Sequence, residues 1–120
     1  TNYSKRFNIN HKKLKILFLG NLDKFELYKH YSETKFLIYP SLKESFGLPL
    51  VEAAQFNCYI LASDKNYVRE VIEATQYFNA HSKDDISEKI LYCMNTKNLK
   101  LPKLKVKNQS SLLLNKVLRE

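Results

Sequence analysis

The sequence has little of several residue types that mark common protein classes. Its 120 residues include 2 Gly, 3 Pro, 2 Cys and no Trp. So little glycine and proline excludes collagen-like and Pro/Gly-rich chains, and two cysteines exclude a disulfide-built scaffold. No stretch approaches the ~20 apolar residues of a membrane span, and the first residues lack the apolar region of a signal peptide. With 44% hydrophobic residues, we expect one soluble, folded domain.

The net charge of +8 is concentrated at the two ends of the chain. Residues 1–15 hold five basic side chains and no acid, and residues 97–120 hold seven basic side chains and one acid. Residues 16–96 are mildly acidic, with 8 basic and 11 acidic side chains. A nucleic-acid groove needs its charge on the folded face, so we expect no nucleic-acid partner. The basic ends predict either solvated tails or contact with an anionic membrane surface.

Apolar runs and helical patterns alternate along the middle of the chain. Strands are predicted at 15–19, 36–39 and 59–62, with a weaker one at 75–78. Helices are predicted at 24–32, 48–56, 67–72 and 84–94, and Leu91 and Met94 are assigned to the apolar face of the last. This order predicts an α/β fold, a partial Rossmann-like three-layer α/β/α domain with a mostly parallel sheet of three to four strands. The domain is assigned to residues 14–95, between a basic segment at 1–13 and a basic tail at 96–120 that contains a candidate helix at 111–118.

The segment PSLKESFGLPLVEAA, residues 40–54, is the most informative part of the sequence. It follows a predicted buried strand and enters a helix, so it lies where ligands bind at the carboxyl ends of a parallel sheet. The amides of Phe46, Gly47 and Leu48 are expected to point off the helix start, where the helix dipole favours an anion. A phosphate or diphosphate is the ligand that this arrangement favours.

Glu44 and Glu52 flank this helix start, eight residues apart. A carboxylate accepts hydrogen bonds from two hydroxyls, as on a ribose or a hexose, so the pair suits a nucleotide sugar. The alternative is that Glu44 is a solvated loop acid and that Glu52 is an acid of the first helical turn, interacting with the helix dipole.

Residues 14–94 resemble the second half of the donor-binding domain of GT-B glycosyltransferases, specifically the retaining family 4 group (glycosyl transferases group 1). The resemblance runs through LKILFLGNL, FLIYPSLKESFGLPLVEAA and YILASDKNYVREVI. It implies that Glu44 contacts the transferred sugar as the catalytic carboxylate and that Glu52 binds the ribose. It also implies that the backbone from Ser45 to Leu48 approaches the donor sugar and its diphosphate.

Three further residues are weaker candidates for the donor site. Asp64 and Asn66 occupy the loop after the third predicted strand, and Glu70 matches an acid that the family places near the start of the next helix. For Glu70, a structural role in which the acid accepts from backbone amides is favoured over a ligand role. The resemblance implies no cofactor and no obligatory metal, because the nucleoside diphosphate sugar is itself the substrate. Cys58 and Cys93 lack metal or CxxC spacing and are predicted to be buried, reduced thiols.

The first hypothesis for function is therefore the donor-binding part of a retaining glycosyltransferase of cell-surface polysaccharide or glycolipid synthesis. On this hypothesis we expect the protein to be cytoplasmic, with attachment to the inner face of the cytoplasmic membrane as an alternative. On this hypothesis the chain alone is inactive and needs an N-terminal acceptor domain, in cis or in trans. The second hypothesis is a truncated, non-catalytic remnant that acts as a binding module with a partner half.

Overall fold

A computed structural model describes residues 17–42 and 47–105, and its centre is a parallel sheet of three strands. The strands are β1 (Phe36–Tyr39), β2 (Tyr59–Ser63) and β4 (Gln76–Phe78), in the order β1-β2-β4. Phe36 pairs with Tyr59 and Leu61 pairs with Gln76, so all three strands run the same way. The α/β class and the parallel sheet predicted from the sequence are confirmed.

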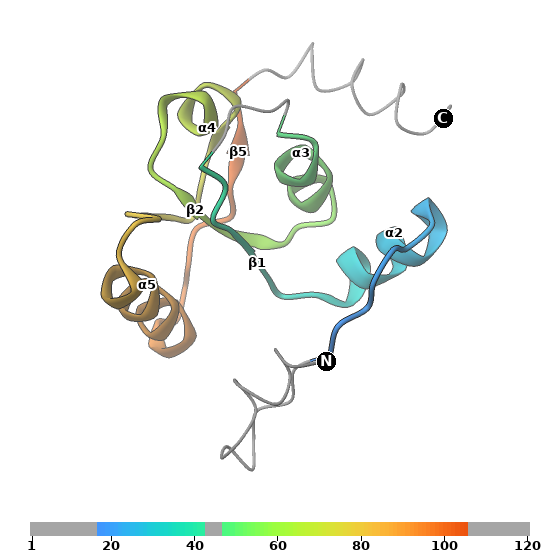
Figure 1. The fold of residues 1–120 in the computed structure, drawn as a ribbon, viewed down its shortest axis with the longest axis horizontal. Helices are drawn as coiled ribbons and strands as arrows, with labels where there is room; N and C mark the ends of the chain where they lie inside the picture. Colours follow the sequence, from blue (N-terminus) through green and yellow to red (C-terminus); the bar gives the residue numbers. More distant parts are fainter. Residues whose placement is uncertain (1–16, 43–46, 106–120) are drawn as a thin grey trace.

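Within residues 17–42 and 47–105, four helices surround these strands (Figure 1). They are α2 (Lys24–Glu33), α3 (Leu48–Gln55), α4 (Asn66–Val71) and α5 (Lys83–Asn95). Helix α3 connects β1 to β2, which requires a crossover between two neighbouring parallel strands. The helix starts agree with the predicted ones to within one residue. The predicted helix 111–118 and the basic segment 1–13 lie outside the described residues.

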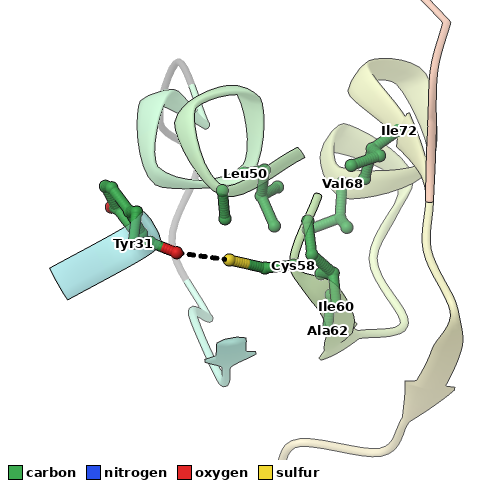
Figure 2. Close-up of a cluster of buried hydrophobic side chains, with 8 residues drawn as sticks. Tyr31, Leu50, Cys58, Ile60, Ala62, Val68 and Ile72 are labelled. Atoms are coloured by element: carbon green, nitrogen blue, oxygen red, sulfur yellow. Dashed lines mark hydrogen bonds between the residues drawn. The ribbon is translucent and has the colours of Figure 1, made fainter. Parts of the chain in front are cut away.

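Strand β2 separates two hydrophobic clusters because its side chains alternate between the two faces of the sheet. Ile60 and Ala62 belong to the first cluster, which takes Tyr31 from α2, Leu50 from α3 and Val68 from α4 (Figure 2). Leu61 belongs to the second cluster, with Phe78 and Cys93, against which Ile86 and Ile90 of α5 pack. Helices thus cover both faces of the sheet, which gives the three-layer arrangement.

Asp23 fixes the start of α2. Its backbone is extended, and its Oδ1 accepts a hydrogen bond of 2.8 Å from the backbone N–H of Glu26. This satisfies one of the first-turn N–H groups that a helix cannot satisfy internally. We expect Asp23→Ala to lower the free energy of unfolding by about 1 kcal/mol, measured by urea denaturation. Asp23→Asn keeps an accepting oxygen and should retain most of the stability; an equal loss in both variants would contradict the capping role.

The predicted strand at 15–19 is wrong for its described residues. Leu17, Phe18 and Leu19 are not in a strand and are 64%, 54% and 49% exposed. A strand is held by hydrogen bonds to a neighbouring strand, and none of the described strands pairs with this segment. An apolar run indicates a strand only when such a neighbour is present.

The described residues after α5 pack back against the sheet layer. Leu99 contacts the second cluster, and Leu104 contacts the first. Strand β5 (Lys103–Leu104) pairs antiparallel with the two-residue strand β3 (Ile72–Glu73), at the position where the sequence predicted the end of a helix. This contact joins residues that are distant in the sequence, so local patterns did not predict it.

Helix α5 also differs from expectation in the face that it buries. Cys93 is 2% exposed, whereas Leu91 and Met94, assigned to the buried face, are 57% and 67% exposed. The buried stripe of α5 runs through Ile86, Ile90 and Cys93, which pack in the second cluster. Leu91 and Met94 lie outside this stripe. None of the described helices is long and apolar enough to cross a membrane.

Both cysteines are buried free thiols, as predicted, one in each cluster. The Cys58 thiol lies 3.4 Å from the carbonyl oxygen of Tyr31 and 3.5 Å from that of Thr34, and so ties β2 to the end of α2 (Figure 2). Burial raises the pKa of both thiols.

Candidate functional site

The carboxyl ends of β1 and β2 form one edge of the sheet, and polar side chains fix the backbone there. The Ser63 hydroxyl lies 3.1 Å from the carbonyl oxygen of Tyr39 and 2.6 Å from that of Ser41. The Tyr67 hydroxyl donates to the Ser41 carbonyl at 2.8 Å and lies 2.9 Å from the Ser41 Oγ. These contacts hold the chain where it leaves β1 toward α3. The sequence did not predict this role of Tyr67.

Helix α3 begins from a left-handed residue, Gly47, at φ 67° and ψ 29°. The Leu50 N–H already donates to the Gly47 carbonyl oxygen at 3.0 Å, and Pro49 in the first turn has no N–H. Among the described residues of this turn, the Leu48 amide therefore remains without an intrahelical acceptor. The helix start thus has the Leu48 donor and a dipole that favours an anion, while the binding of an anion by the amides of Phe46, Gly47 and Leu48 stays a prediction.

The left-handed backbone at Gly47 predicts a loss of stability when Gly47 is replaced. A Cβ there would meet Leu50 Cδ1 at 3.4 Å and would carry the cost of a left-handed L-residue. We expect Gly47→Ala to lower the free energy of unfolding by about 1 kcal/mol. Gly20 has the same φ of 67° but lies in exposed coil with open space around its Cβ position. Gly20→Ala carries the same left-handed cost without these contacts, so it should cost no more than Gly47→Ala in urea denaturation. A larger cost at Gly20, or no cost at Gly47, would refute the argument.

Glu52, the fifth residue of α3, is only 6% exposed and points toward α2. It forms a hydrogen bond with the Tyr31 side chain, while its Oε2 is buried with no partner among the described residues. Burial raises the pKa of the carboxyl group, against smaller lowering effects of the Tyr31 hydrogen bond and of the positive charge on Lys24. The interpretation of Glu52 as a first-turn acid is wrong, because α3 has no acid in its first turn.

Three aromatic side chains lie close together near Glu52, where α2 packs on α3. The Phe56 ring centroid lies 5.6 Å from that of Tyr28 and 5.9 Å from that of Tyr31. The Tyr28 hydroxyl oxygen is buried without a partner among the described residues. Burial first, and then the Glu52 charge, raise the pKa of both tyrosines. Their spacing of three on α2 put both on one helix side, but nothing in the sequence placed that side against Glu52.

The structure leaves part of the predicted site undescribed. Glu44, Ser45 and Phe46 lie outside the described residues. That Glu44 and Glu52 lie on either side of the helix start therefore stays a prediction. Gly47 and Glu52 lie on the same helix, with Gly47 at its cap and Glu52 one turn further on.

The three weaker candidates lie on α4 and the loop before it, and all three are exposed. Asp64 Oδ1 accepts a hydrogen bond of 2.6 Å from Arg69 Nε, and this bond holds the pKa of Asp64 below its usual value. Asn66 is the first residue of α4, and Glu70 lies within that helix. In the described ranges, no three His, Cys, Asp or Glu side chains gather as a metal site.

Comparison with known proteins decides the family. The profile of the glycosyl transferases group 1 family matches residues 2–109. The chain belongs to this family.

Curated relatives of this glycosyl transferases group 1 chain are bacterial. Three Escherichia coli proteins described as serotype-specific mannosyltransferase WbdA are each 32% identical to it over 77 residues. The matched segment is 63% of this chain and 9% of each relative, so the chain spans a small part of those proteins. No solved structure matches the chain significantly.

Proposed function

We propose that this glycosyl transferases group 1 chain forms the nucleotide-sugar-binding part of a retaining hexosyltransferase. The observation that carries the proposal is the Glu52 carboxylate, which is buried near the start of α3 with one oxygen that has no partner among the described residues. A buried acceptor without a donor is costly unless a ligand supplies one. Two ribose hydroxyls supply such donors, and the family membership makes a nucleoside diphosphate sugar the ligand to expect.

The neighbouring helix start supports the other half of the donor. With the ribose at Glu52, the diphosphate extends toward the first turn of α3, where the Leu48 amide and the helix dipole favour negative charge. In transfer, the bond between the anomeric carbon and the diphosphate oxygen breaks, and a hydroxyl oxygen of the acceptor bonds to that carbon and loses its proton. The leaving diphosphate gains charge. Donors fixed before the reaction stabilise that charge. Glu44 is proposed to hold hydroxyls of the transferred sugar, with no obligatory metal.

The relatives suggest which sugar and product to test. Because they are described as mannosyltransferases, we propose a mannosyl unit as the hexosyl group and a polysaccharide or glycolipid as the product class. The 120-residue chain by itself is expected to bind the donor without transferring it, since the resemblance assigns acceptor binding to a separate domain, in cis or in trans. We propose a cytoplasmic site of action, which is consistent with the free thiols Cys58 and Cys93.

Titration calorimetry with GDP, UDP and their sugars tests donor binding. We expect one of these nucleotides to bind the purified chain and the binding to be lost in Glu52→Ala. Binding by none of them would overturn the proposal and favour the non-catalytic remnant with a partner half. Sugar transfer by the isolated chain would contradict the need for a separate acceptor domain.

A further inference from the structure

A cavity of about 530 Å³ lies beside α4, β5 and the connection from β3 to β4. Four basic side chains line it, Arg69, Lys100, Lys103 and Lys105, together with one acid, Glu73. Its volume is within the range of small-molecule sites. No described residue of the proposed donor site lines this cavity.

The pairing of β3 with β5 explains why the charges gather at this cavity. Ile72 pairs with Leu104, and both contribute to the first hydrophobic cluster. Because strand side chains alternate, Glu73, Lys103 and Lys105 lie on the opposite side from this pair. Glu73 is the register partner of Lys103, so one lysine of the cavity has an acid directly across the ladder.

Tyr77 and Arg69 form an ordered wall of the same cavity. The Tyr77 hydroxyl donates to the Ile72 carbonyl oxygen at 2.8 Å and accepts from the Ala74 N–H at 3.1 Å, which fixes its ring. The Arg69 Cζ lies 4.0 Å from that ring's centroid, and Arg69 Nε donates to Asp64. With Nε engaged, the two terminal nitrogens of the guanidinium have no hydrogen bond to any described residue.

The charges of the cavity are not balanced within the described part of the chain. Asp64 offsets Arg69 and Glu73 faces Lys103, but Lys100 and Lys105 form no ion pair with a described acid. Like charges around one cavity repel, and an anion placed among them relieves that repulsion. A phosphate offers several acceptor oxygens to ammonium and guanidinium donors at once.

We propose that this cavity binds a phosphate group of an anionic ligand, at a site separate from the donor site. Arg69, held on the Tyr77 ring, offers its terminal nitrogens, and Lys100 and Lys105 provide the unbalanced positive charge. The phosphate can belong to a soluble molecule or to a lipid headgroup, which share this chemistry. Donor binding at α3 is not required, so failure of one proposal leaves the other standing.

NMR titration of the ¹⁵N-labelled 120-residue chain with pyrophosphate tests the site and locates it. We expect saturable shifts of amides in 73–77 and 100–105. Lys105→Gln should raise the dissociation constant roughly tenfold, the loss expected for one charge-assisted hydrogen bond. Lys29→Gln removes the same charge from the exposed side of α2, away from the cavity, and should leave the dissociation constant unchanged.

Vesicles that contain phosphatidic acid test the lipid source. Sedimentation of the chain with these vesicles, weakened by Lys105→Gln and not by Lys29→Gln, would support the site with a headgroup phosphate as its ligand. Equal weakening in both variants would show attraction to net charge alone and would overturn the proposal. Shifts confined to the start of α3, or no binding of pyrophosphate and vesicles, would overturn it equally.

Discussion

Glu52→Gln is expected to weaken nucleotide binding while it stabilises the fold at neutral pH. The amide keeps the shape of the side chain but loses the charge, so hydrogen bonds from ribose hydroxyls become weaker. The loss of a charged acceptor predicts a tenfold to hundredfold increase in the dissociation constant of the nucleotide, about 1.5–3 kcal/mol. The carboxylate is buried, and one of its oxygens has no partner in the part of the chain that the structure describes, so its replacement removes the cost of burying that charge.

The pH dependence of stability separates this effect from ordinary packing changes. Burial raises the pKa of Glu52 in the folded state above its ordinary value of 4.5. The folded state therefore binds the proton more tightly than the unfolded state, and stability attributable to Glu52 rises as pH falls through the raised pKa. The cost of the charged form is complete above that pKa and absent below 4.5. Urea midpoints of Glu52→Gln should exceed those of the parent at pH 7 and match them near pH 4.

Glu70→Gln is the matched control for both measurements. Glu70 is exposed on α4, so loss of its charge should change neither the urea midpoint nor the dissociation constant. Titration calorimetry and urea denaturation of both variants, across pH, give the comparison. If Glu52→Gln destabilised the fold at pH 7, or bound nucleotide as tightly as the parent, the assigned role of Glu52 would be wrong. If Glu70→Gln alone weakened binding, the acid that contacts the nucleotide would lie on α4.

Phe78→Ala is expected to cause the largest loss of stability, about 3–5 kcal/mol. Phe78 ends β4 and is 1% exposed in the second cluster, where it lies with Leu61 of β2 and Cys93 of α5. Removal of the Phe78 ring leaves a cavity between α5 and the face of the sheet that α5 covers. A loss of this size is a large fraction of the stability of a small domain. Urea denaturation followed by far-UV circular dichroism measures it.

Phe25→Ala removes the same atoms from the surface and serves as the control. Phe25 is 81% exposed on α2, so we expect a change within about 0.5 kcal/mol. Phe78→Leu should cost less than Phe78→Ala and remains measurable if the alanine variant does not fold. Comparable losses in Phe25→Ala and Phe78→Leu would show that the second cluster contributes little to the fold.

The sequence predicts most helices and strands of this chain because their signals are local. Asp23 and Pro49 mark helix starts, and the runs FLIY and YILA mark strands that lie in the sheet. Where the structure departs, the cause is a non-local partner. Residues 17–19 have the composition of a strand, but no described strand pairs with them. Strand β5 has little strand character in its sequence, but it pairs with β3.

The candidate site shows the same division. The loop-to-helix pattern predicts that a helix starts after Gly47 and contains Glu52, because both depend on residues close in the sequence. The left-handed backbone of Gly47 was not predicted. Tyr28 and Tyr31 of α2 lie more than twenty residues before Glu52 in the sequence, and only the packing of α2 on α3 brings them to it. That packing buries the carboxylate and raises its pKa, which spacing along the chain does not encode.

The two cysteines also divide the molecule by face. Cys58 lies on the side covered by α2, α3 and α4, and Cys93 lies on the side covered by α5. Because both thiols are buried and have raised pKa values, a thiol reagent reaches each one only when its own layer opens. The chain thus has one thiol probe on each side of the sheet. The ratio of the labelling rates of Cys58 and Cys93 compares how often the two helical layers open.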